Sequence, residues 1–209
     1  MPEHSSTRLA SVNRRQFLKL GGGITLAGLF SQSAQAASAD MSHGPRTSKN
    51  IALTFHGAGP ISNADALLSI FKSTHTPVSV FAIGTWLQSN PQIAKKIIED
   101  GHVLGNHTMH HIKGWRNRNA KYLNDIETCE NEIQAIKNQI SLSEKPNRLL
   151  FRPPYGQIKP SQISLIRSKG YEIIQWSDLS CDYDPRLDCN KSLKALVKNV
   201  KPGSIVVFH

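Results

Sequence analysis

The sequence predicts an α/β fold in which a parallel sheet with helical crossovers closes into a barrel. After residue 50, apolar runs typical of strands alternate with amphipathic stretches typical of helices, and no hairpin signal joins neighbouring strands. Polar and ring-bearing residues directly follow one strand after another. The carboxyl ends of barrel strands converge on one face, so this recurrence indicates a single functional site at that face.

The first 36 residues are expected to be a targeting segment outside this fold. Residues 13–19 carry a twin-arginine pattern, an apolar stretch covers 20–30, and residues 34–36 offer a small-residue cleavage site. The alternative is a membrane anchor, but the apolar stretch is too short to span a bilayer and contains four glycines. We therefore expect export by the twin-arginine route to a periplasmic, extracellular or cell-wall location, with no stable membrane span after cleavage.

Removal of 36 of the 209 residues leaves 173, enough for one domain with a sizeable core. The leader holds four of the 25 Lys and Arg and one of the 15 Asp and Glu, which leaves a formal charge of +7. A basic exported protein is suited to anionic envelope polymers, whereas scattered lysines argue against nucleic acid. Cys181 and Cys189 could form a disulfide in an oxidising compartment, and Cys129 lies at helical core spacing.

The elements are expected in the following order. Residues 37–50 lack periodicity and form a flexible lead-in. Strands are predicted at 51–55, 78–83, 102–105, 148–151, 172–176 and 204–208. Helices are predicted to follow Asn63, to begin at Asn90-Pro91, to run from Leu123 to Ile140, to surround Ile163 and to run from Leu193 to Val200. Residues 56–60 form a glycine-broken turn, and residues 177–188 form an acidic turn.

A histidine cluster follows the third predicted strand. His107, His110 and His111 lie within five residues. His107 and His111 are four apart, so a helical turn would point both imidazoles to one side, as a divalent metal requires. Two histidines are an incomplete ligand shell, and the alternative is a solvated loop.

Five stretches together resemble the motifs of the polysaccharide deacetylase family, which has a NodB-like domain and forms carbohydrate esterase family 4. They are Thr54-Phe55 for the first motif, His107-Thr108-x-x-His111 for H-[ST]-x-x-H, Arg152-Pro-Pro-Tyr155 for the third, Trp176 to Tyr183 for W-S-x-D-x-x-D-W, and Val207-Phe208-His209 for the terminal L-x-H. The resemblance covers about residue 50 to the end. It implies a distorted barrel of seven or eight β/α units, a divalent metal (usually zinc) and hydrolysis of N-acetyl groups on a polymeric amino sugar.

Three departures separate this chain from the family pattern. The usual T-F-D-D-G is replaced by Thr54-Phe55-His56-Gly57-Ala58, so both carboxylates are absent, although this form resembles the T-F-H-G first motif of a subgroup of the family. In the fourth motif Leu179 takes the place of the earlier Asp, and Asp178 precedes it. The family continues for a further helix and strand, whereas this sequence stops at His209. We therefore expect a barrel that lacks its last β/α unit.

The resemblance assigns roles to individual residues. His107 and His111 correspond to two metal ligands, and His56 is either the third ligand or the general base in place of the family's Asp. The alternative for His56 is a buried structural histidine bonded to the backbone. Arg152, which pairs with that Asp in the family, would here face the His56 ring and favour its neutral form.

His209 resembles the general acid, with Asp182 orienting its ring, although Asp182 could also be a plain turn residue. The backbone N–H of Tyr155 would stabilise the oxyanion, with Pro153 and Pro154 fixing its approach. The rings of Tyr155 and Trp176 would line the sugar groove, although Trp176 could be plain core.

These roles favour an exported metal-dependent hydrolase that removes N-acetyl groups from amino sugars of a polysaccharide, such as peptidoglycan, a chitin-like polymer or an exopolysaccharide. The main alternative is a catalytically impaired carbohydrate-binding pseudoenzyme, because the first-motif carboxylates are missing. A third hypothesis is a deacylase of small amides. The sequence does not indicate the oligomeric state.

Overall fold

The structure is a computed structural model that describes residues 41–47, 49–140, 148–184 and 186–209. These residues belong to one compact unit, Ala37–His209. The predicted targeting segment at 1–36 lies outside the described residues. Part of the predicted flexible lead-in is tied to the sheet instead, because Met41 N–H donates to Ile173 O (3.0 Å) and Gly44 N–H donates to Gly203 O (2.7 Å).

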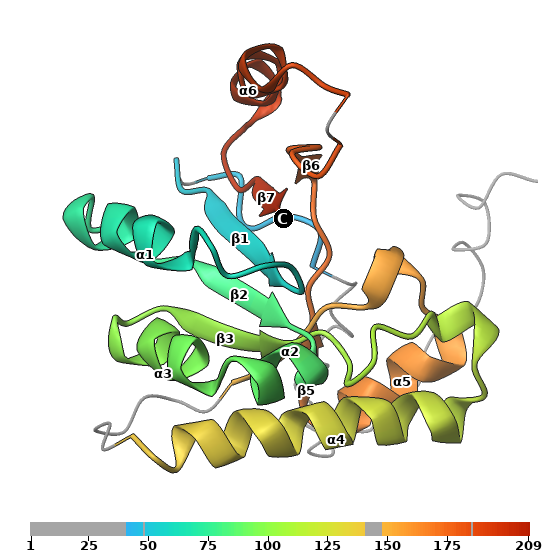
Figure 1. The fold of residues 1–209 in the computed structure, drawn as a ribbon. Coiled ribbons are helices and arrows are strands. Elements are labelled where there is room, and N and C mark those ends of the chain that lie inside the picture. Colours follow the sequence, from blue (N-terminus) through green and yellow to red (C-terminus); the bar gives the residue numbers. More distant parts are fainter. Residues whose placement is uncertain (1–40, 48, 141–147, 185) are drawn as a thin grey trace, which may run out of the picture. The chain divides into compact units, whose positions relative to one another are not determined.

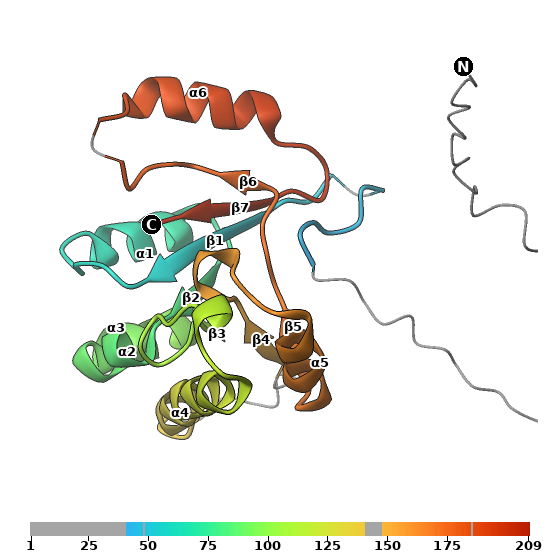
Figure 2. The same ribbon diagram turned by 90° about the vertical axis from the view of Figure 1, so that its right-hand side faces the viewer.

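The unit is built on one parallel sheet of seven strands in the order β5-β4-β3-β2-β1-β7-β6 (Figure 1). The strands are β1 (Ala52–Gly57), β2 (Ser79–Ala82), β3 (Val103–Asn106), β4 (Leu149–Phe151), β5 (Tyr171–Ile173), β6 (Asp178–Leu179) and β7 (Ile205–Phe208). The sheet curls strongly between its two edge strands (Figure 2), which confirms the predicted α/β barrel-type architecture. Strand β6 was not predicted, because its two residues are too few to show an alternating pattern.

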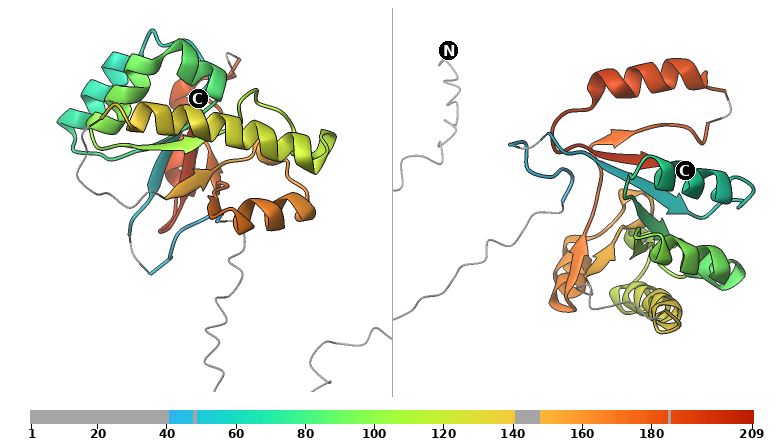
Figure 3. Two further views of the ribbon diagram at one scale, coloured as in Figure 1. Left: turned by 90° about the horizontal axis from the view of Figure 1, so that it is seen from below. Right: turned by 90° about the vertical axis from the view of Figure 1, so that its left-hand side faces the viewer.

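Helices cover the outer side of the curled sheet (Figure 3). They are α1 (Ala64–Ser73), α2 (Gly84–Ser89), α3 (Pro91–Glu99), α4 (Asn119–Lys137), α5 (Pro160–Ser168) and α6 (Cys189–Asn199), with short 3₁₀ turns η1 (Gly114–Arg116) and η2 (Pro154–Gly156). The six-residue helix α2 was not predicted. Within the described ranges, no helix is long and apolar enough to cross a membrane.

Alternation along β1 decides which side chains face the site. Phe55 packs on the outer side against Phe71 of α1, with ring centroids 5.1 Å apart. Its neighbours Thr54 and His56 therefore point to the inner side. There Phe81 of β2 lies against Gly105 of β3, where a Cβ atom would be 2.8 Å from the Phe81 ring. The glycine thus lets the aromatic ring fill the interior below the site.

Candidate active site

A cavity of about 510 Å³ opens at the carboxyl ends of the strands, where the sequence predicted a site. Its lining residues come from the loop after β1, the histidine loop after β3, η2, and the segments around β6 and β7. They are His56, Ala58, Gly59, His111, Tyr155, Trp176, Leu179, Tyr183 and His209. None of these described lining residues is an aspartate or a glutamate.

Four histidines meet at one end of this cavity. The ring of His56 stacks on His107 with centroids 4.4 Å apart, and its edge meets His209 at 4.7 Å. The ring of His111 lies 4.9 Å from that of His107. The structure therefore brings the three sequence-predicted ligands and the predicted acid into a single cluster.

The chain that carries His107 and His111 is not the expected helical turn. It is an irregular loop in which Thr108 and His111 adopt left-handed backbone angles, with φ of 66° and 56°. The loop is held because Asn106 Oδ1 accepts from Thr108 N–H (2.9 Å) and Asp125 O accepts from Met109 N–H (3.0 Å). These bonds replace helical ones, so the two imidazoles converge by loop geometry rather than by helical spacing.

The tautomer of His107 is fixed by its surroundings. Its Nδ1 lies 2.7 Å from Arg152 O, and a carbonyl can only accept, so Nδ1 carries the proton. The unprotonated Nε2 is buried and has no hydrogen-bond partner among the described atoms. Burial lowers the pKa of His107 to about 3 despite that hydrogen bond, so the ring is neutral at physiological pH.

His56 shows the same combination. Its Nε2 is also buried without a partner among the described residues. Burial is the main cause that holds the pKa of His56 far below its ordinary value, and the nearby His107 and Arg152 add to it. Burial likewise lowers the pKa of His111. A neutral imidazole that donates from one nitrogen and offers the other is the form that binds a metal.

These observations test whether the residues fit a metal ion. In the described ranges, no group of three His, Cys, Asp or Glu side chains is already arranged around one point. Two buried imidazole nitrogens of this cluster, on His56 and His107, nevertheless have no hydrogen-bond partner among the described atoms, which is costly unless something binds them. The histidines therefore fit an ion by donor type and protonation state, and binding would require small movements of their side chains.

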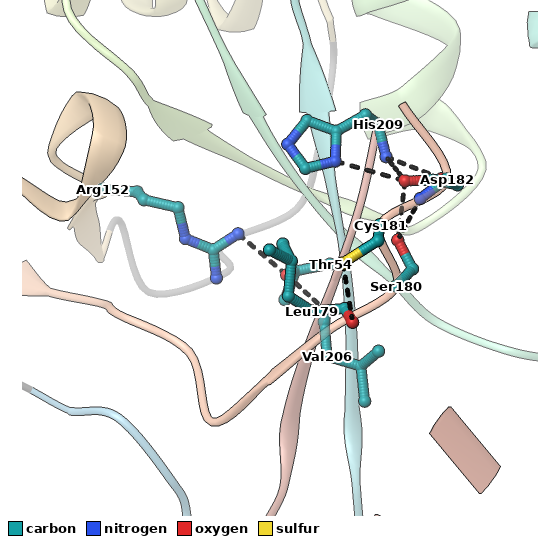
Figure 4. Close-up of polar contacts among 8 residues, drawn as sticks. All are labelled: Thr54, Arg152, Leu179, Ser180, Cys181, Asp182, Val206 and His209. Carbon is teal, nitrogen blue, oxygen red and sulfur yellow. Dashed lines mark hydrogen bonds and ion pairs between the residues drawn. The ribbon is translucent and has the colours of Figure 1, made fainter. Parts of the chain in front are cut away.

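Arg152 is fully buried beneath the cluster and does not line the cavity. It donates to Thr54 Oγ1 (2.8 Å) and to the backbone oxygens of Ile174 (3.3 Å) and Gln175 (3.2 Å), and its guanidinium lies 4.1 Å from the Phe81 ring centroid. No described carboxylate forms an ion pair with it, and burial lowers its pKa to about 9. Figure 4 shows Arg152 reaching Thr54, which in turn donates to Val206 O at 2.7 Å. Sequence reasoning missed this role of Thr54.

Asp182 and His209 form the pair that the resemblance implied (Figure 4). Asp182 Oδ1 lies 3.2 Å from His209 Nδ1, and Asp182 Oδ2 accepts from His209 N–H at 2.9 Å. Burial would raise the pKa of the Asp182 carboxyl, but hydrogen bonds from His209 and Ser180 outweigh it and lower that pKa. An ionised Asp182 holds the proton on Nδ1 of His209 and turns its other nitrogen away from the carboxylate.

The remaining predicted residues divide between the cavity wall and its support. Tyr155 and Trp176 line the cavity, whereas Pro154 is buried at the start of η2 and does not. Tyr155 has a left-handed φ of 59°, which turns its ring toward His111 at 4.7 Å. Tyr183, to which no role was assigned from the sequence, packs edge-on against His209 at 4.7 Å.

The cysteines follow the predictions in part. Cys129 is buried in the core, as expected. Cys181 and Cys189 are both free thiols, so the disulfide considered from the sequence is not formed here. Both line one small cavity of about 90 Å³ next to Asp182.

Residues 43–174 match the family model for polysaccharide deacetylases. The chain therefore belongs to the polysaccharide deacetylase family, and its curled parallel sheet with a histidine cluster at the carboxyl end agrees with this. The chain is 31% identical over 169 residues to a peptidoglycan-N-acetylglucosamine deacetylase of Bacillus cereus, covering 79% of this chain and 74% of the relative. It is 24% identical to a peptidoglycan-N-acetylmuramic acid deacetylase of Bacillus subtilis, covering 77% of this chain but only 60% of that protein.

Solved structures agree with the fold. A crystal structure of a peptidoglycan N-acetylglucosamine deacetylase superposes with a TM-score of 0.72 at 26% identity, covering 80% of this chain and 75% of that one. A family 4 pseudoenzyme from Bacillus anthracis superposes with a TM-score of 0.73 at 22% identity, covering 80% of this chain and 57% of that one. The similarity to the pseudoenzyme concerns the fold alone.

Proposed function

We propose that this protein is an exported, metal-dependent hydrolase that removes N-acetyl groups from amino sugars of an envelope polysaccharide. The observation that carries the proposal is the cluster of neutral histidines, two with unpartnered buried nitrogens, in one cavity with the Asp182–His209 pair. The names of the two Bacillus deacetylases support peptidoglycan as the polymer. Export rests on the twin-arginine pattern within residues 1–36.

We assign the metal to His56, His107 and His111, with zinc as the ion, because zinc binds neutral imidazole in sets of three. The chemistry that such an ion supplies when bound is Lewis acidity toward the acetyl carbonyl. We assign His56 as a ligand rather than as the base because its ring stacks on that of His107, and the Nε2 atoms of both rings have no partner among the described atoms. Two neighbouring nitrogens of this kind suit one shared ion.

The chain's own residues supply proton transfer and orientation. His209, held by Asp182, delivers a proton to the leaving amine. The backbone N–H of Tyr155 is directed at the oxyanion, and buried Pro154 fixes the turn that presents it. The rings of Tyr155 and Trp176 form walls against which a sugar packs.

A second function, a catalytically impaired carbohydrate-binding protein, is favoured by one observation. The described cavity lining contains no carboxylate that could act as the general base, and His56 stands where the family has one. Carbohydrate binding would remain possible because the aromatic walls are intact.

The test is zinc stoichiometry of the full chain together with acetate release from an N-acetylglucosamine oligomer, for wild type, His56→Ala and His107→Ala. We expect one zinc per chain in the wild type, loss of zinc in both variants, and acetate release only by the wild type. His43→Ala is the control, because His43 is exposed and, among the described residues, its side chain bonds only to the backbone of its neighbour Gly44. Zinc retained in His56→Ala with no acetate release would make His56 the base. A folded wild type that contains no zinc and releases no acetate would contradict the enzyme and support the second function, a carbohydrate-binding protein.

A further inference from the structure

An exposed tryptophan lies on η1, the 3₁₀ turn that follows the histidine loop and contacts the segment after η2. This residue, Trp115, is 61% exposed. It is nevertheless held in place, because its Nε1–H donates to Ile158 O at 3.0 Å. A large aromatic ring that is exposed and fixed in orientation is typical of a ligand-stacking surface rather than of a core residue.

The backbone under this ring is also rigid. Gly114 N–H donates to Gln157 O (3.1 Å), and Gln162 Nε2 donates to Gly114 O (3.0 Å). A Cβ atom at Gly114 would lie 2.5 Å from Gln157 O, so this close approach of η1 to the segment after η2 requires glycine. Binding to a surface fixed in this way loses little conformational entropy.

A cation two residues before this tryptophan contacts a side chain of the cavity wall. Lys113 Nζ is 4.4 Å from the centroid of the Tyr155 ring. Tyr155 is 55% exposed, lines the cavity and contacts His111 with its ring. The lysine is therefore held at the cavity rim by a cation–π contact. None of the ion pairs among the described residues involves Lys113, so its charge is available to a ligand.

The charge around Lys113 has one sign. The stretch from Lys113 to Lys121 contains two lysines and two arginines, Arg116 and Arg118. No aspartate or glutamate occurs between Gly101 and Asn124. This stretch therefore carries a local positive charge that attracts an anion.

We propose that Trp115 and Lys113 form a glycan subsite beside the reacting sugar, in which Trp115 stacks on a sugar ring and Lys113 binds a carboxylate carried by the glycan. The substrate class that this subsite selects is an N-acetylated glycan with carboxylate-bearing sugars, rather than a neutral amino-sugar polymer. The subsite rests on the proposed function for its place beside the reacting unit, but its binding can be measured without turnover.

The experiment compares two ligands that share one glycan backbone, of which only one carries charged carboxylates. They are peptide-free strands of alternating N-acetylglucosamine and N-acetylmuramic acid, and the same strands with every carboxyl converted to a methyl amide. Dissociation constants are measured by calorimetry on the full chain with a chelator present, which prevents metal-dependent turnover. Lys113→Ala is expected to weaken binding of the carboxylate strands about tenfold, the scale of one hydrogen bond to a charged group, and to leave the amide strands unchanged.

Three further variants separate the roles of ring and charge. Trp115→Ala is expected to weaken both ligands about fivefold, and Trp115→Phe to restore most of that loss, because a ring is retained. Lys194→Ala, on helix α6, removes one exposed positive charge away from η1 and is expected to change neither ligand.

The proposal is overturned if Lys113→Ala weakens both ligands equally, if it has no larger effect than Lys194→Ala, or if Trp115→Ala changes neither ligand. Failure of the proposed function would appear separately, as absent acetate release from the chelator-free wild type. Absent acetate release with intact selectivity for the carboxylate strands would leave the subsite standing in a binding protein.

Discussion

The burial of His107 predicts how the stability of the metal-free protein depends on pH. The side chain is 1% exposed, its Nδ1–H donates to Arg152 O, and its pKa is lowered to about 3 from 6.5. Replacing it in the variant His107→Asn removes the titrating group. The shorter amide can still donate a hydrogen bond toward the same carbonyl.

The sign follows from proton binding. Below pH 6.5 the unfolded chain gains a proton on this residue, whereas the folded chain does not gain it until about pH 3. The stabilising contribution of neutral His107 is therefore complete above pH 6.5 and is lost as the pH falls toward 3. In that window the free energy of unfolding falls by about 1.4 kcal/mol per pH unit for this group, or roughly 3 kcal/mol over two units.

The assay is urea unfolding with a chelator present, at several pH values between about 7.5 and 4.5. His107→Asn is expected to be less stable than the wild type at neutral pH. On acidification its free energy of unfolding should fall less steeply, with a slope smaller than that of the wild type by about 1.4 kcal/mol per pH unit. His43→Asn, at an exposed position, should keep the wild-type slope. Equal slopes for His107→Asn and the wild type would refute the burial of a neutral imidazole at this position.

Substitutions at two other positions test the contacts around the site. Thr54→Val removes the acceptor of an Arg152 N–H and the bond to Val206 O, so we expect the free energy of unfolding to fall by about 2 kcal/mol. Thr54→Ser keeps the hydroxyl and should lose much less; equal losses in the two variants would contradict this role of Thr54. Asp182→Asn should lower kcat about 100-fold without changing zinc content, because the ring of His209 loses its orienting carboxylate; a lowered zinc content would show that Asp182 acts at the metal instead.

The fold could be read from the sequence because its longer elements repeat a clear pattern. The strands around Thr54 and Val80 are apolar runs bounded by glycine or proline, and the long helix keeps apolar residues three and four apart. Short elements carry no such pattern. Strand β6 exists only because Asp178 and Leu179 pair with β7, a partner far away in sequence.

The sequence indicated which side chains lie close together at the cavity, but not the local geometry of the chain that carries them. The resemblance named His56, Asp182 and His209, and the structure brings them together around one cavity. The helical turn expected at His107 was wrong, because the amide oxygen of Asn106 captures a backbone N–H and favours an irregular loop. Side-chain hydrogen bonds of this kind leave no periodic trace in a sequence.

The position of β1 has a consequence for synthesis on the ribosome. This strand lies inside the sheet, paired on one side with β2 and on the other with β7, whose residues 205–208 are made well after those of β1. Until they emerge, a nascent chain presents one side of β1 without its partner, which is a template for pairing with other chains. Synthesis of β7 therefore both covers the open side of β1 and brings His209 to the cavity, so protection of this strand and assembly of the histidine cluster occur in the same step.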